Sequence, residues 1–267
     1  MNLKLLAIES SGQTCSVALL LGEPGAAKIY CKSASVPRKH AELLLPMINE
    51  LMQEHSISPE QINFIAFGEG PGNFTGIRLS ASIAQGLAYG WNKQVLPVST
   101  LASMALAAGE KYQINKIMVA MDARKQEISF AAYEINQNKS PGSRIKSGKL
   151  KISESDDVVL KSIKNTGILQ PGKIKLPEGD GWLAIGDAWG KYSQELLPVL
   201  EPESNNKIMR LEAEFLPDAS MVAKLAERLF KIQGQDQDQD QDQDQNQEGA
   251  VLLSAEQALP QYFRDSV

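Results

Sequence analysis

The sequence contains few of the residues on which several classes of protein depend. Its 267 residues include two cysteines, two histidines and only 6% aromatic residues. Cys15 and Cys31 form no C-x-x-C pair, which argues against a disulfide framework. His40 and His55 are too far apart for an H-x-x-x-H or H-E-x-x-H motif, so a metalloprotease site is poorly supplied. The missing chemistry therefore argues against a self-sufficient metal or thiol enzyme.

Long apolar stretches are also missing. No run approaches the roughly 20 apolar residues that are needed to cross a bilayer. The N-terminal segment lacks the basic, apolar and small-residue stages of a signal peptide. We expect a soluble, cytoplasmic protein with no membrane contact.

Charge of one sign is concentrated in a single tract. The chain has 27 basic and 32 acidic residues, and its net charge is −5. Five aspartates and one glutamate lie between Gln235 and Glu248, so the rest of the chain holds 27 basic and 26 acidic residues. This near-neutral remainder argues neither for nor against nucleic-acid binding. Because alternating Gln and Asp offer no apolar face, we predict that residues 234–249 are disordered.

The first hundred residues alternate short apolar runs with amphipathic segments. Strands are expected at 3–8, 15–21, 27–33, 62–67 and 95–98, and helices at 40–55, 75–91 and 100–110. The predicted order is βββαβαβα. We assign residues 1–100 to an N-terminal lobe.

The same order partly recurs in residues 101–212, which we assign to a second lobe. Strands are expected at 116–121, 127–135, 149–153 and 183–186, and helices at 156–164 and 190–200. A structural duplication follows from this order, although the sequence shows no repeat. We expect a helix at 213–232 within a segment, 213–233, that returns to the first lobe, and a tail, 250–267, that docks back as an edge segment.

A glycine-rich turn, Gly68 to Arg78, separates a predicted strand from a predicted helix. Free N–H groups at a helix N-terminus suit an anion, but the turn lacks the Gly-Lys-Ser/Thr ending of a P-loop. The structural alternative is that the glycines permit a tight turn and close packing, with Asn73 or Thr75 as the helix cap. With the polar hairpin at residues 9–14, the candidate anion- or nucleotide-facing residues are Glu9, Ser10, Thr14, Gly70, Gly72 and Thr75.

The helices expected at 40–55 and 75–91 are apolar on more than one side. In the helix 75–91, small residues recur every four positions, and small side chains let a partner helix approach closely. The alternative is packing on the protein's own sheet. The candidate partner-binding residues are Leu44, Met47, Ile48, Leu51, Ser80, Ala84 and Ala88.

Five motifs together resemble the bacterial TsaB (YeaZ) family. They are Ile8–Ser11, His40–Pro46, Gly70–Arg78, Asp122–Arg124 with Glu127, and Pro260–Arg264. The resemblance implies an α/β, two-lobed fold of the actin, sugar kinase and Hsp70 ATPase (ASKHA) type. It also places the helices 40–55 and 75–91 side by side, as half of a four-helix bundle with the same pair from the TsaD subunit.

The resemblance further implies a non-catalytic scaffold and dimerisation subunit. The complex concerned makes N6-threonylcarbamoyladenosine at position 37 of tRNAs that read ANN codons. In it, this chain would bind and support the catalytic subunit TsaD, help to recruit the ATPase TsaE, and meet tRNA only indirectly. Alone, it would form a homodimer. No cofactor would be bound tightly, and ATP or ADP would be present only in the assembled complex.

The two metal-binding histidines of the TsaD family match Thr100 and Met104 here. Neither side chain replaces an imidazole at a metal, so we expect a pseudoenzyme with no catalytic residue and no metal site. Two alternatives stay open. One is an independent ASKHA nucleotide hydrolase that uses Glu9, Thr14 and the Gly70–Gly76 turn, and the other is a peptidase.

Overall fold

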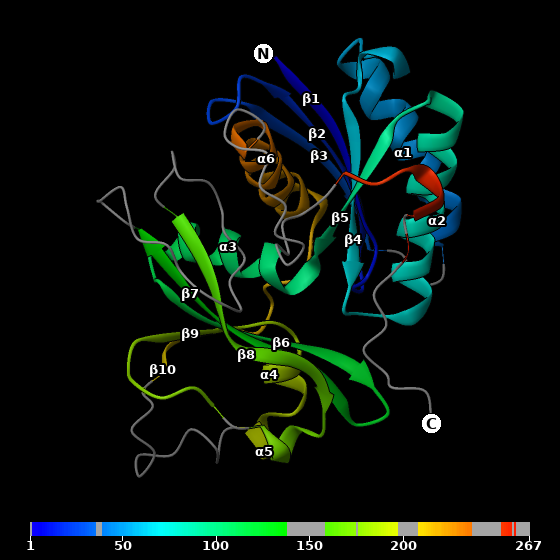
Figure 1. The fold of residues 1–267 in the computed structure, drawn as a ribbon. Helices are drawn as coiled ribbons and strands as arrows, with labels where there is room; N and C mark the ends of the chain where they lie inside the picture. The colour runs from blue at the N-terminus through cyan, green and yellow to red at the C-terminus, as the bar shows by residue number, and fades with distance from the viewer. Residues whose placement is uncertain are drawn as a thin grey trace.

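The computed structural model describes residues 2–35, 39–137, 158–174, 176–196, 208–236, 252–257 and 259. Two five-stranded sheets, A and B, form two lobes (Figure 1). Sheet A contains β1 (Leu3–Glu9), β2 (Cys15–Gly22), β3 (Lys28–Ala34), β4 (Phe64–Gly70) and β5 (Gln94–Ser99). Sheet B contains β6 (Lys116–Arg124), β7 (Glu127–Gln137), β8 (Val158–Leu169), β9 (Trp182–Ile185) and β10 (Ile208–Glu212).

The two sheets have the same topology. Sheet A has the order β3-β2-β1-β4-β5, and sheet B, read from its other edge, has the order β8-β7-β6-β9-β10. In each sheet the first three strands are antiparallel, and the fourth and fifth run parallel to the first. The chain is therefore a structural duplication, and its fold is the predicted two-lobed ASKHA-like α/β fold.

Helices cover both faces of sheet A. The helices are α1 (His40–Glu54), α2 (Phe74–Trp91), α3 (Thr100–Tyr112), α4 (Ala188–Lys191), α5 (Ser193–Leu196) and α6 (Ala219–Asp236), with 3-10 turns η1 (Pro59–Gln61), η2 (Pro171–Lys173) and η4 (Ala255–Gln257). The helices α1 and α2 lie on one face, and α6 lies on the other (Figure 1). Along β1, Leu6 and Ile8 pack toward α1 and α2, whereas Leu5 and Ala7 pack toward α6. A strand that is covered on both faces is largely apolar, and residues 3–8 are apolar except for Lys4.

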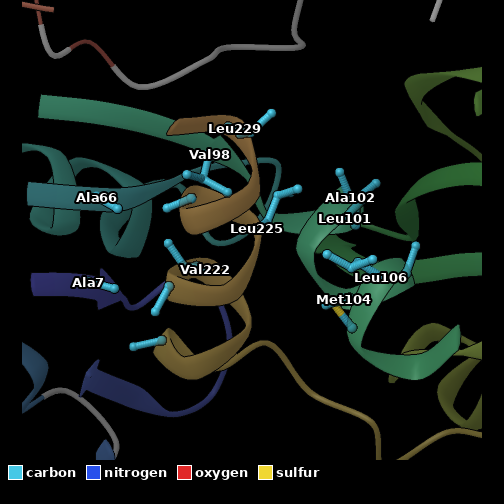
Figure 2. Packing of buried hydrophobic residues seen from close by; sticks show 14 of the residues in the cluster. Ala7, Ala66, Val98, Leu101, Ala102, Met104, Leu106, Val222, Leu225 and Leu229 are labelled. Atoms are coloured by element: carbon cyan, nitrogen blue, oxygen red, sulfur yellow. The ribbon is translucent and has the colours of Figure 1, made fainter. Parts of the chain in front are cut away.

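The largest hydrophobic cluster joins the two lobes. Figure 2 shows α6 between the strands of sheet A and the helix α3. Val222 and Leu225 of α6 share this cluster with Leu106 of α3 and with residues of sheet B. Although α3 follows sheet A in the chain, it contacts β6 and β7, and α6 follows sheet B but packs on sheet A. The two lobes thus exchange their last helices.

Two predicted elements of the second lobe are wrong. Residues 158–169 form β8 rather than a helix, because this segment, which begins Val158-Val159, pairs along β7. The expected helix at 190–200 is divided into α4 and α5, and the remainder, 197–200, lies outside the described residues. The strand expected at 149–153 also lies outside them, and β10 was not predicted.

The last helix begins later than its sequence indicates. It starts at Ala219, after Pro217, with the backbone N–H of Ala219 donating to Ser16 Oγ at 2.8 Å and that of Ser220 donating to Asp218 Oδ1 at 2.7 Å. It reaches Asp236, so the Gln-Asp tract begins inside a helix. Residues 237–251 lie outside the described part of the chain. Among the described residues, no helix has the length and apolar content that a membrane span requires.

Candidate functional site

The polar turn after β1 is buried rather than open to solvent. Glu9 and Ser10 are both 0% exposed. The Glu9 carboxylate accepts hydrogen bonds from the Ser11 backbone N–H at 2.6 Å and from the Thr100 hydroxyl at 3.0 Å. Ser10 Oγ donates to the Gly76 carbonyl at 2.8 Å and lies 2.7 Å from Ser80 Oγ. The placement of Glu9 and Ser10 on an open anion-facing loop is therefore wrong, because protein groups already satisfy them.

The glycines of the turn make room for this buried segment. A Cβ atom at Gly76 would overlap the Ser10 carbonyl oxygen, and one at Gly72 would lie 2.5 Å from the Ser11 Cβ. Gly70 has a φ of 105°, which favours glycine. Asn73 Oδ1 accepts the Thr75 N–H at 3.3 Å and caps α2. The structural alternative for the glycine-rich turn is thus confirmed.

Thr14 and Thr75 complete the candidate loop residues, and they lie in different surroundings. The Thr14 hydroxyl lies 3.5 Å from the Pro217 carbonyl oxygen, in the turn before α6. A Cβ atom at Gly12 would lie 2.8 Å from the Pro217 side chain. Thr75 is exposed at the N-terminus of α2. The structure therefore does not bring the six candidate residues together around one open loop.

Two carboxyl groups near this turn have raised pKa values. Burial raises the pKa of Glu9, although its hydrogen bonds from Ser11 and Thr100 act in the opposite direction. Burial also raises the pKa of Glu69 to about 7. Both groups lie at the carboxyl ends of neighbouring strands, β1 and β4. Protonation at this edge of sheet A therefore contributes to folding.

The positions that match the TsaD metal ligands point into the protein. Thr100 is buried and hydrogen-bonded to Glu9, and Met104 is buried in the cluster between the lobes (Figure 2). Within the described ranges, no three His, Cys, Asp or Glu side chains are grouped so that they could hold a metal ion. The residues present at these two positions do not fit a metal centre.

The Asp122–Arg124 motif fixes a hairpin to α4. Asp122 accepts hydrogen bonds from Tyr192 OH at 2.7 Å and Lys191 Nζ at 2.5 Å, and its backbone N–H donates to Asp187 at 2.9 Å. Burial would raise the pKa of Asp122, but hydrogen bonds from Lys191, Tyr192 and the Arg124 N–H hold it below its ordinary value. The motif therefore stabilises the second lobe internally.

The seven candidate partner-binding residues are buried within the chain itself. Leu44, Met47, Ile48, Leu51, Ala84 and Ala88 belong to the cluster between the two helices and sheet A, and Ser80 is bonded to Ser10. Six of the seven are therefore misassigned to a partner surface, because they cover their own sheet, whereas Ile48 also lines a groove between the two helices. The helices α1 and α2 do contact each other, as expected.

The opposite face of the same helices is exposed. Leu45 is 50% exposed on α1, and Tyr89 is 78% exposed on α2. A second small row on α2, Ser82, Gly86 and Gly90, is also exposed, and apart from the neighbouring residues and backbone of the helix itself no described atom lies within 4 Å of a Cβ built at either glycine. Sequence reasoning missed this row. Two glycines four apart inside a helix were the available signal, because glycine disfavours helix and needs another reason to be there.

A groove between α1 and α2 opens on this exposed side. Its volume is about 370 Å³, and its lining residues are Leu45, Ile48, Asn49, Met52, Gln53, Ile57, Pro59, Leu87 and Trp91. Most of these side chains are apolar. We call the exposed side of α1 and α2, with Leu45, Tyr89, the row Ser82–Gly86–Gly90 and this groove, the outer helical face.

Comparisons with known proteins agree with the fold and the motifs. A family model described as TsaD, tRNA N6-adenosine threonylcarbamoyltransferase, matches residues 34–161. The tRNA threonylcarbamoyladenosine biosynthesis protein TsaB of Haemophilus influenzae is 35% identical over 195 residues, which cover 72% of this chain and 75% of the relative. The protein of the same name from Escherichia coli is 32% identical over 206 residues, covering 74% and 83%.

Solved structures match along nearly the whole chain. YeaZ from Pseudomonas aeruginosa superposes with a TM-score of 0.72 at 28% identity and covers 97% of this chain and 99% of its own. A second structure, described as an uncharacterized protein from that organism with similarity to the peptidase YeaZ, gives a TM-score of 0.73 at 27% identity, with coverage of 98% and 100%. These relatives, together with the shared topology of the two lobes, show that the chain belongs to the TsaB (YeaZ) family.

Proposed function

We propose that this chain is a non-catalytic scaffold subunit in the synthesis of N6-threonylcarbamoyladenosine at position 37 of ANN-decoding tRNAs. Membership of the TsaB family supports the pathway, since its relatives carry that process in their names. The proposed partner is a TsaD-type transferase subunit. The exposed outer helical face is the observation that carries the partner role.

The outer helical face has the properties of a helix-packing surface. Ser82, Gly86 and Gly90 leave the backbone of α2 accessible, so a partner helix can approach closely. Tyr89 is exposed next to Gly90 on α2, Leu45 is exposed on α1 at the groove, and exposed aromatic side chains are typical anchors of interfaces. The groove at Leu87 and Trp91 would receive a partner's apolar side chain.

The non-catalytic role is supported by the interior of the molecule. Glu9, one of the residues that the hydrolase alternative would use, is not accessible to a substrate, because it is buried and accepts a hydrogen bond from Thr100. Thr100 and Met104 occupy the positions of the transferase histidines with side chains that do not suit a metal. No contact among the described residues favours the hydrolase or the peptidase alternative.

The remaining partners follow from the same role. TsaE would dock on the assembled pair, tRNA would be met through the complex, and ATP or ADP would be held only there. In the absence of TsaD, the outer helical face would pair with a second copy of this chain. A cytoplasmic location suits a tRNA-modifying complex.

Gly86→Arg tests the proposal. The side chain of an arginine at this position would project into the space that a partner helix needs, and its burial without a counter-ion costs several kcal/mol. We expect a folded protein that is monomeric in analytical ultracentrifugation and no longer retains TsaD in a pull-down. Retention of TsaD by a folded Gly86→Arg protein would place the interface elsewhere.

Two matched variants separate the interface from the fold. Gly86→Ala adds only a methyl group and is expected to keep TsaD binding. Ala84→Arg lies on the buried side of the same helix and is expected to reduce soluble yield and lower the Tm by more than 10 °C, since it forces a charge into a packed core. If Ala84→Arg were as stable as the parent, the assignment of the two faces would be wrong.

A further inference from the structure

A short C-terminal segment lies along the edge of sheet A. The backbone N–H of Val95 donates to the Leu253 carbonyl at 2.9 Å, and the N–H of Leu253 donates to the Val95 carbonyl at 2.8 Å. Val95 belongs to β5, the last strand of the sheet. Figure 1 shows the segment, in red, passing β5 and continuing beside α2. The segment thus adds a single antiparallel bridge to this edge.

The side chains of the segment reach both faces of the sheet. Leu252 packs against the cluster on the α6 side, whereas Leu253 and Ala255 pack against the cluster below α1 and α2. The Ser254 N–H donates to Gln257 Oε1 at 3.1 Å, which closes η4, and η4 contacts α2. The segment therefore joins the edge of β5 to the helix that carries the outer helical face.

Few contacts hold the segment in place. Leu252, Leu253 and Ala255 are only partly buried, and Ser254 and Gln257 are exposed. By comparison, β4 pairs with β5 from Phe64 to Gly70. Residues 233–249, which connect α6 to this region, contain no hydrophobic residue. Among the described residues, the segment is held by two backbone hydrogen bonds to Val95, three partly buried side chains and the contact of η4 with α2.

We propose that the edge of β5 at Val95 is a strand-addition site that the chain occupies with its own residues 252–257 as a detachable strap. Backbone pairing supplies the affinity, and the apolar pair Leu252 and Leu253, one on each face, supplies the specificity. Docked, the strap covers an otherwise open strand edge, which is a hazard for association. Released, it exposes that edge and the flank of α2 together.

Hydrogen exchange on the full chain tests the strap. If it detaches, the Val95 amide exchanges at least tenfold faster than the Ile65 amide of the interior strand β4, because local opening is easier than global unfolding. The variant Leu253→Pro loses the N–H that bonds Val95, and we expect a further increase of tenfold or more at Val95 with no change at Ile65. The control Leu259→Pro changes an exposed residue beyond η4 and is expected to leave Val95 unchanged.

A synthetic peptide of residues 250–259 provides the second arm. Added at millimolar concentration to the Leu253→Pro protein, it is expected to restore slow exchange at Val95, whereas the same peptide with proline at position 253 is not. Equal exchange at Val95 and Ile65 in the parent chain would overturn the proposal, as would global unfolding of Leu253→Pro, because the segment would then be an integral strand. Failure of the parent peptide to protect Val95 would also overturn it.

Discussion

Two carboxyl groups at the carboxyl ends of β1 and β4 make the stability of the protein depend on pH. The pKa values of Glu9 and Glu69 are both raised in the folded state, chiefly by burial. Such a group binds its proton more tightly when folded, so its contribution to stability is complete below the unfolded pKa, near 4.5, and is lost as the pH rises through the folded pKa. For Glu69 this loss falls between about pH 4.5 and 7.

We therefore predict that the free energy of unfolding falls between pH 5 and pH 8. Glu69→Gln removes one of the two titrations and is expected to reduce that fall by about 2 kcal/mol, measured by urea denaturation at both pH values. The exposed Glu42→Gln is the matched control and is expected to behave as the parent. An unchanged pH dependence in Glu69→Gln would show that Glu69 is solvated in the folded protein.

Two glycines of the same helix are expected to respond oppositely to alanine. At Gly76 a Cβ atom would overlap the Ser10 carbonyl, so Gly76→Ala must displace backbone and is expected to cost at least 2 kcal/mol. At Gly86 the space is open, and Gly86→Ala is expected to stabilise α2 by about 0.5–1 kcal/mol. Thermal unfolding measures both. A Gly76→Ala protein as stable as the parent would contradict the packing of Ser10 against α2, and a destabilised Gly86→Ala protein would contradict the open space at Gly86.

At the scale of elements, α2 shows why a pattern alone did not identify the exposed side of a helix. It carries two rows of small residues, Ser80–Ala84–Ala88 and Ser82–Gly86–Gly90, each with a spacing of four. Periodicity identifies both rows but does not say which one covers the sheet. The buried side of the helix is decided by β1 and β4, whose Ile8 and Ile65 pack in the cluster that holds Ala84 and Ala88.

The Gln-Asp tract is expected to be a tether whose composition matters little. Replacing residues 237–247 with a Gly-Ser sequence of the same length keeps the reach of the connection and removes its charge. We expect the Tm to change by less than about 2 °C, because no apolar side chain is lost. A decrease of more than about 4 °C, which corresponds to roughly 1 kcal/mol or more, would show that the tract packs on the folded body.

At the scale of the whole molecule, the duplication joins two lobes through exchanged helices. The last helix of each half packs on the sheet of the other, and Glu110 of α3 pairs with Lys224 and Arg228 of α6 across the junction. Apolar residues from both sheets and both helices form one continuous cluster there. The division of the chain at residue 100 stays a prediction, although β5 ends at Ser99 and α3 begins at Thr100.

The burial of the two positions that match the TsaD metal ligands leads to a prediction for the isolated chain. Because Thr100 and Met104 are buried among protein contacts, we expect no stoichiometric zinc or iron and no threonylcarbamoyl transfer by this chain alone. Elemental analysis after chelator treatment, with a transfer assay on tRNA, measures both. One tightly bound transition metal per chain, or transfer without a TsaD subunit, would contradict the pseudoenzyme proposal.

The sequence by itself determined most strands, the first three helices, the two-lobed fold class and the family. Short apolar runs and helical periodicity are local signals, and the motifs lie along the printed chain. It failed where tertiary contacts decided the outcome. Residues 158–169 became a strand because β7 offered an edge to pair with, and α6 began at Ala219 because Ser16 accepts its first N–H.

The candidate site, too, was predicted from the sequence only in part. The glycine-rich turn was visible as a feature, but its purpose depended on Ser10 and Ser11, which belong to the turn after β1 and lie against it only in the fold. Likewise, the helices α1 and α2 were found from periodicity, whereas their inward and outward sides were set by sheet A. Chain-distant neighbours determine burial, and a single sequence does not specify which neighbours those are.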